Sequence, residues 1–213
     1  RERPADRNNR RRVEWEFPCA RANPIGPNCG SCQGSIYTLT NLGLVTDLFS
    51  GDGLADTYRI MLTIDTTGYT GTGVRIDEVA VKVSSGLNGA TLVSAPGGTS
   101  NWNLVTGGVN ANGCSGSGAG FDCAMFTGST GGAVVPGTLL TWVFDLDITG
   151  PLFTAPLSAS IKARYVNAAG NKVGALMSEN ITLTQVPEPS ALLLLSSAVP
   201  AIGFAVRRRR SRR

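Results

Sequence analysis

The residues best suited to chemistry in this chain are its five cysteines: Cys19, Cys29, Cys32, Cys114 and Cys123. Gly30-Ser31 separates Cys29 from Cys32, which is the spacing of a redox-active pair. Such a pair opens a helix, whereas the prolines and glycines around this one predict turns, so a redox site is the less favoured hypothesis. A zinc site of four cysteines would need a second close pair, but eight residues separate Cys114 from Cys123.

Disulfide bonds are the favoured use of these cysteines. Ala20-Arg21-Ala22 resembles the A-x-A site at which a signal peptide is cleaved, and cleavage there would remove Cys19. The remaining four cysteines form an even set, as in proteins of oxidising compartments, and allow three pairings. We expect Cys114 to pair with Cys123, which would staple the Gly-rich loop at 107–120. Cys29 would pair with Cys32, with crossed pairings as the alternative.

A pair of carboxylates offers a second candidate site. Asp145 and Asp147 lie two residues apart on a predicted strand, so their side chains point to the same face, roughly 7 Å apart. This separation falls in the range of inverting glycosidases. The same face is where solvent is expected, opposite Trp142 and Phe144, so an ordinary surface role is favoured.

Other catalytic and metal chemistry has little support. The chain has no histidine, which is the usual base for serine and cysteine nucleophiles and the commonest metal ligand. Asp47, Asp52 and Asp56 have carboxylates that suit Ca²⁺, but their spacing does not follow a calcium-binding loop and a surface turn is favoured. We therefore expect no catalytic residue, no metal, no cofactor and no enzymatic activity.

The basic charge of the chain belongs to its two ends. The net charge is +4, yet residues 22–206 hold six basic and eleven acidic residues and are therefore net acidic. Nucleic-acid binding needs positive charge clustered on the folded surface, so no nucleic-acid partner is expected.

The last 28 residues consist of three parts. Val186-Pro187-Glu188-Pro189-Ser190 comes first, and its prolines favour an extended chain. Residues 191–206 carry no charge and would form a helix about 24 Å long, a short span for a bilayer core of about 30 Å. The arginines that follow would remain on the cytoplasmic side of the membrane.

This order of short motif, apolar run and basic block resembles the PEP-CTERM sorting domain. The resemblance covers residues 186–213 and implies a Gram-negative bacterium whose exosortase recognises Pro187, Glu188 and Pro189. It implies that the stop-transfer block consists of Arg207, Arg208, Arg209 and Arg210. It also implies that residues 191–206 anchor the protein in the inner membrane, C-terminus in the cytoplasm, until the enzyme removes the anchor. Delivery to the cell surface or to an exopolysaccharide matrix would follow.

Residues 28–185 are expected to form one all-β domain. Short runs of alternating apolar and polar residues are separated by Gly, Asn, Asp and Pro. About nine such runs predict an antiparallel β-sandwich, jelly-roll or immunoglobulin-like, with a barrel as the alternative and one hydrophobic helix after it. The predicted strands lie at 35–42, 57–65, 79–83, 90–94, 101–106, 121–127, 141–148, 158–166 and 180–184. The side chains expected to face the core in three of them are Tyr58, Ile60, Leu62 and Ile64; Trp142, Phe144, Leu146 and Ile148; and Ala159, Ile161, Ala163 and Tyr165, with Lys162 and Arg164 facing outward.

Residues 1–27 are basic and are expected to be disordered. They contain no apolar core of a signal peptide, so we expect the true signal peptide to have been lost to a wrong start or a frameshift; a genuine basic arm is the alternative. The function expected for the whole is that of a non-enzymatic surface or matrix protein. The alternatives are a carbohydrate-binding module, for which Trp102 is the candidate exposed aromatic residue, and a hydrolase that uses Asp145 and Asp147.

Overall fold

The computed structural model describes residues 20–22, 24–46, 56–83, 87–114, 120–128, 133–134, 137–148 and 158–185. Several predicted features lie outside these ranges: most of the basic N-terminal segment with Cys19, the Pro-Glu-Pro motif, the apolar run at 191–206 and the arginine block. Asp47 and Asp52 also lie outside them, whereas Asp56 is the first residue of a strand.

The described part of the chain consists almost entirely of β-strands. One short 3-10 helix, η1 (Thr99–Asn101), lies among them. The strands are β1 (Ala20–Ala22), β2 (Ile36–Thr46), β3 (Asp56–Asp65), β4 (Arg75–Lys82), β5 (Leu87–Ser94), β6 (Trp102–Thr106), β7 (Val109–Asn110), β8 (Gly113–Cys114), β9 (Asp122–Phe126), β10 (Ala133–Val134), β11 (Leu139–Ile148), β12 (Ser158–Val166) and β13 (Met177–Gln185).

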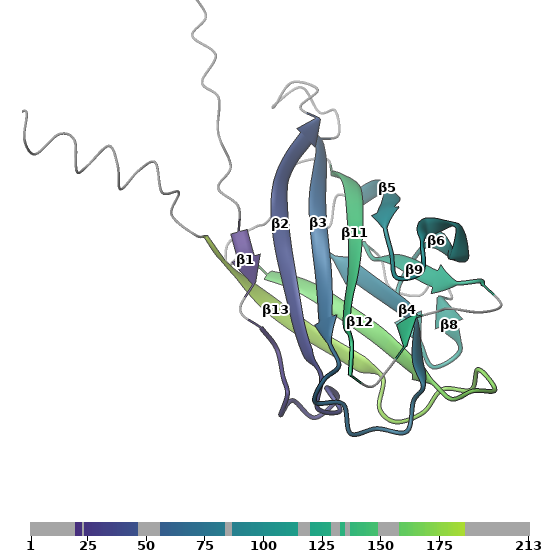
Figure 1. The fold of residues 1–213 in the computed structure, drawn as a ribbon. Helices are drawn as coiled ribbons and strands as arrows, with labels where there is room; N and C mark the ends of the chain where they lie inside the picture. Colours follow the sequence, from purple (N-terminus) through teal and green to yellow (C-terminus); the bar gives the residue numbers. More distant parts are fainter. Residues whose placement is uncertain are drawn as a thin grey trace, which may run out of the picture.

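Eleven of these strands form one large sheet that folds over on itself, and β7 and β8 form a separate two-stranded sheet. The order of the large sheet is β5-β11-β3-β2-β1-β13-β12-β4-β9-β6, with β10 paired to β4, and neighbouring strands are antiparallel. Figure 1 shows β2, β3 and β11 lying across β13, β12 and β4, so the two halves face one another as layers. We call β5-β11-β3-β2 layer A and β13-β12-β4-β9-β6 layer B. The all-β, antiparallel sandwich predicted from sequence is confirmed.

β1 joins the two layers along one side. Arg21 pairs with Thr40 of β2 and with Thr184 of β13, so β1 bridges their edges. At the other end of the strand order, β5 and β6 are not hydrogen-bonded to each other in the described ranges, so closure into a barrel is not complete.

The core of the sandwich follows the alternation seen in the sequence. In β11 the side chains of Trp142, Phe144, Leu146 and Ile148 are fully buried, as predicted. Opposite them in the same layer, β3 buries the predicted set Tyr58, Ile60, Leu62 and Ile64. Burying one such large side chain stabilises the fold by about 1.5–3 kcal/mol, so these two strands carry much of the driving force for packing.

Layer B supplies the other half of the core. The predicted inward residues of β12 are all buried: Ala159, Ile161, Ala163 and Tyr165. Val79 and Val81 of β4 join them, while Ala80 contacts a second, smaller apolar cluster. β4 is buried from Ile76 to Val81 without alternation because both of its faces are covered.

Two short elements differ from the sequence prediction. Residues 1–27 were expected to be disordered, but Ala20–Ala22 lies within the sheet and Ile25 forms a bridge with Tyr37, so the folded body extends before residue 28. Edge strands leave backbone groups unpaired, and β1 satisfies those of β2 and β13. The Gly-rich stretch at 107–120 was expected to be a loop, but it contains the β7–β8 hairpin.

Candidate functional site

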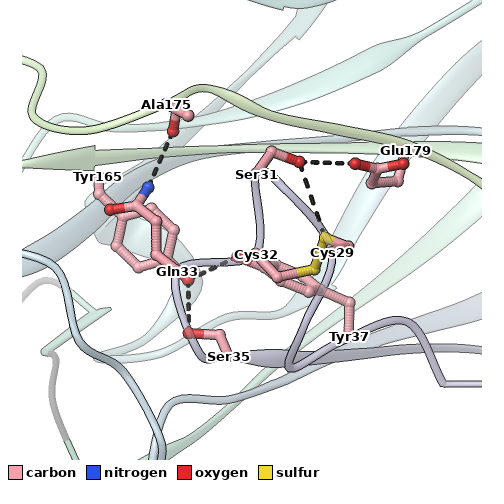
Figure 2. The surroundings of a disulfide bond; sticks show 9 residues. All are labelled: Cys29, Ser31, Cys32, Gln33, Ser35, Tyr37, Tyr165, Ala175 and Glu179. Atoms are coloured by element: carbon pink, nitrogen blue, oxygen red, sulfur yellow. Dashed lines mark hydrogen bonds between the residues drawn. A yellow bond between two sulfur atoms is a disulfide. The ribbon is translucent and has the colours of Figure 1, made fainter.

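A disulfide-closed turn lies at the start of β2. Cys29 and Cys32 are bonded, with their Cα atoms 5.1 Å apart, and the Cys32 amide donates to the Cys29 carbonyl at 3.1 Å. Cys32 is fully buried, whereas Cys29 is half-buried. Figure 2 shows that the turn packs under the strand that carries Glu179.

Polar side chains fix this turn to the neighbouring elements. The Ser31 hydroxyl donates to Glu179 Oε1 at 2.7 Å, and Gln33 Nε2 donates to the Ala175 carbonyl at 2.8 Å (Figure 2). The Thr70 amide donates to the Gln33 carbonyl at 2.9 Å. The turn is therefore tied both to β13 and to the loops that flank layer B.

A buried tyrosine network lies beneath the turn. The hydroxyls of Tyr37 and Tyr165 are 2.6 Å apart, and the Tyr165 hydroxyl donates to Ser35 Oγ at 2.9 Å. The ring of Tyr69 stacks on that of Tyr165 with centroids 4.6 Å apart. Burial raises the pKa of Tyr37 far above its usual value, and the proximity of Tyr165 raises it further. Both phenols therefore remain neutral and join layer A to layer B.

The surroundings of Cys29 and Cys32 suit a structural bond better than a redox centre. Reactive cysteines lie at helix N-termini or beside cations, which stabilise the thiolate. This turn is followed by strand β2 and not by a helix. Among the described residues, the charged group that it contacts is the carboxylate of Glu179, which accepts the hydrogen bond from Ser31. A carboxylate disfavours a neighbouring thiolate. The geometry therefore supports a structural disulfide between Cys29 and Cys32 over a redox-active pair.

The second disulfide fastens the β7–β8 hairpin to layer B. Cys114 of β8 is bonded to Cys123 of β9, as the sequence predicted. The hairpin lies on the outer face of layer B, where Val109 packs with Ala80 and Phe121 in the smaller apolar cluster. The crossed pairings are therefore wrong, because each bond joins cysteines that the fold brings side by side.

A cluster of ionisable side chains lies under the same hairpin. Arg164 donates two hydrogen bonds to Asp77, at 3.1 and 2.7 Å, and its Nη2 lies 3.0 Å from Glu78 Oε1. Burial alone lowers the pKa of Arg164, but the contacts with Asp77 and Glu78 raise it overall. A Cβ atom at Gly113 would lie 2.6 Å from Glu78 Oε1, so only glycine lets the hairpin approach this closely.

Glu78 is the least satisfied member of this cluster. Its side chain is 2% exposed, and its Oε2 atom is buried without a hydrogen-bond partner in the described part of the chain. Burial raises the pKa of Glu78 to about 7, and Asp77 adds to this, while Arg164 and the Cys114 amide oppose it. Asp77 occupies Arg164 through two contacts, so the loss of hydration outweighs the attraction at Glu78.

The sequence did not identify this cluster. Asp77 and Glu78 look like solvent-facing residues at the start of a strand, and Arg164 was correctly placed on the outer face of β12. The sequence did hold a signal for it, because two acidic residues on one strand and an arginine on another can form an ion pair if the strands are neighbours. β4 and β12 are such neighbours, and Arg164 is in register with Glu78.

The Asp145 and Asp147 carboxylates are both engaged by β3. Arg59 binds Asp145 through two hydrogen bonds, at 2.7 and 2.8 Å, and the Thr57 hydroxyl donates to Asp147 Oδ1 at 2.7 Å. The two aspartates lie on one face of β11, as predicted, but each has a fixed partner in register on the neighbouring strand. Arg59 and Asp145 thus form an ion pair across the two strands, and Asp147 is held by a neutral hydroxyl.

The prediction for Trp102 is wrong. Its side chain is buried, and its Nε1 atom donates to the Pro96 carbonyl at 2.9 Å. Its ring lies edge-on to those of Phe126 and Trp142 with centroids 5.4 Å away in each case. The turn at Pro96 and η1 folds beneath the indole, so Trp102 belongs to the core and offers no surface for stacking a sugar.

The last strand of the domain changes neighbours along its length. β12 pairs with residues 177–182 of β13, whereas Leu183, Thr184 and Gln185 pair with Ala22, Arg21 and Ala20. In the described ranges, β1 is thus the one strand that pairs with the final three residues of β13. β13 ends at Gln185, the residue before Val186-Pro187-Glu188-Pro189 in the sequence.

Residues 185–210 match the family model of the PEP-CTERM protein-sorting motif. The chain carries a PEP-CTERM sorting motif. The match confirms the resemblance drawn from sequence, and it begins at the residue where β13 ends. Among curated proteins, no significant match to the chain is found.

The PEP-CTERM motif marks this chain as an exported protein that an exosortase sorts. The Pro-Glu-Pro residues and the arginine block lie outside the described ranges. Of the matched residues, the structure describes only Gln185, the last residue of β13. Within those ranges no helix is long and apolar enough to cross a membrane, and the apolar run at 191–206 is not part of them. No group of three or more potential ligands that could hold a metal ion occurs in the same ranges.

Proposed function

We propose that this protein is a non-enzymatic component of the bacterial cell surface or exopolysaccharide matrix. Exosortase releases it from a transient anchor in the inner membrane. The observation that carries the proposal is the PEP-CTERM match at 185–210, which starts at the last residue of β13. The apolar run at 191–206 would form the anchor, with the arginines after it in the cytoplasm.

Two features of the domain support an extracellular role. Both disulfides belong to an oxidising compartment, and a bond that closes a short loop stabilises a domain by roughly 2–3 kcal/mol. The paired state of Asp145 and Asp147 supports a structural or adhesive role over glycan hydrolysis. A matrix polysaccharide is the partner we propose, held by polar surface groups because the candidate Trp102 is buried.

The destination can be tested by fractionation. The full chain is produced in strains with and without exosortase, and the cell surface, medium and membrane fractions are probed. We expect the protein in the surface or medium fraction only when exosortase is present. Glu188→Ala should leave it in the membrane fraction of both strains, and Ser178→Ala, at an exposed position outside the motif, serves as the control. Release of the Glu188→Ala variant would show that the motif is not what sorts the protein.

A further inference from the structure

We propose that β1 is a releasable clip that controls how far the sorting motif reaches from the folded domain. This inference rests on the proposed processing by exosortase and on an exported chain that keeps Ala20–Ala22, because cleavage after Ala22 at the A-x-A sequence would remove β1. It concerns when exosortase can reach its substrate. β1 is three residues long, and its register places Ala22 against Leu183 and Ala20 against Gln185. The pairing therefore ends at the residue before the motif.

The clip shortens the reach of the motif. Only residues 186–190 separate the end of β13 from the apolar run at 191, and five residues extend at most about 17 Å. When Leu183–Gln185 is paired, the edge of the sheet is therefore within about 17 Å of the membrane-embedded segment. Releasing those three residues adds up to about 10 Å, because each extended residue spans about 3.4 Å.

The clip also occupies the backbone that a processing enzyme would use. Enzymes that bind peptides in extended form pair with the main chain as an added strand. The main chain of Leu183, Thr184 and Gln185 is already paired with β1. The enzyme and β1 cannot both take this edge, so an enzyme that pairs with it must first displace β1.

The structure makes release of the clip easier than opening of the sheet elsewhere. β3 and β11 pair over ten residue positions, whereas β1 pairs with β13 over three and with β2 over one. Short terminal pairings open more readily than long central ones. Opening β1 also leaves the pairing of β12 with residues 177–182 intact, so the body of the domain remains folded.

A cross-strand disulfide tests the clip in the full chain. Ala22→Cys with Leu183→Cys joins two residues in register and locks β1 onto β13. The matched control, Ser160→Cys with Asn180→Cys, locks β12 onto β13 at another register pair and leaves the clip free. Bond formation is checked by intact mass and on a non-reducing gel, and the rate of tail removal is then followed in the exosortase strain.

We expect the locked clip to accumulate uncut and the control to be cut like the wild type. Inserting Gly-Ser-Gly after Gln185 should restore cutting of the locked chain, because the linker replaces the reach of the three clipped residues. Arg21→Pro, which cannot donate a backbone hydrogen bond, should speed cutting without any added cysteine.

Each contrary result has one meaning. Equal cutting of the locked clip and its control would overturn the clip, as would an Arg21→Pro variant cut no faster than the wild type. Failure of the linker to restore cutting would show that reach is not what the lock removes. An uncut wild-type chain would overturn the proposed function itself, and the clip with it. An intact mass showing that the exported chain begins after Ala22 would overturn the clip alone, because β1 would be missing.

Discussion

The two ends of β13 differ in how they are held. Near its start, Met177 is fully buried in the core, and Glu179 accepts a hydrogen bond from the disulfide-closed turn. At its end, Leu183–Gln185 pairs with the three residues of β1. The first part of β13 is therefore held firmly by the core and the turn, whereas in the described ranges its last three residues pair only with the short strand β1. Stability is unevenly distributed in proteins, and segments that must move belong to its low end.

The fixed end should respond most strongly to mutation. Met177→Ala removes a fully buried side chain and should lower the free energy of unfolding by about 2–5 kcal/mol. Urea denaturation followed by tryptophan fluorescence measures this, since Trp142 and Trp102 lie in the core. The neighbouring Ser178 is exposed, and Ser178→Ala should leave stability nearly unchanged. Equal effects of the two substitutions would contradict the description of this end as firmly held.

A change of pH should alter the free energy of unfolding of the domain without altering how readily Leu183–Gln185 separates from β1. The pKa of Glu78 rises from 4.5 in the unfolded chain to about 7 in the fold, so the folded state binds its proton more tightly. The free energy of unfolding should therefore fall as pH rises from about 4.5 to about 7, by at most about 3 kcal/mol. Burial raises the pKa of Asp122 as well, which gives a slope of the same sign.

The matched variant for this prediction is Glu78→Gln. Glutamine has the shape of glutamate but does not titrate. The free energy of unfolding of the variant should therefore depend on pH less steeply, and Asp122 should account for the slope that is left. Hydrogen exchange at Leu183–Gln185, referred to a model peptide at each pH, should be the same in variant and wild type. A slope that survives Glu78→Gln unchanged would assign the pH dependence to another group.

The weakly held end should show a small effect on global stability and a large local one. Arg21→Pro removes a backbone donor from β1 and should change the free energy of unfolding by about 1 kcal/mol or less. Amide exchange at Leu183–Gln185 should lose its protection, while that of Glu179–Ile181, paired with β12, should be retained. Loss of protection along the whole of β13 would mean that the strand opens as one unit and that its two ends do not differ.

Much of the fold could be predicted because its strands alternate over eight or more residues. In β3, β11 and β12, period-two burial leaves one register that buries the apolar set, and the structure has it. β1 could not be predicted in this way. Three residues between Pro18 and Pro24 carry no periodicity, and they form a strand because the edges of β2 and β13 face each other.

The candidate sites also differ in whether local sequence or distant segments determine them. The bond between Cys114 and Cys123 followed from a Gly-rich loop that needed a staple, which is a local property. The burial of Glu78 depends on the β7–β8 hairpin, which is distant in sequence and folds over it. Trp102 likewise packs against Trp142 of β11, forty residues later in the chain. Local patterns place a side chain on a face of a strand, but they do not reveal what later covers that face.

The most direct test of the central claim is the intact mass of the protein from strains with and without exosortase. With the enzyme, we expect a product that retains Gln185 and all of β13 but has lost the apolar run and the arginines. Its mass should rise by four hydrogens on reduction, for the two disulfides Cys29–Cys32 and Cys114–Cys123. Without the enzyme, the tail should remain. A tail present in both strains, or a cut inside β13, would contradict the account.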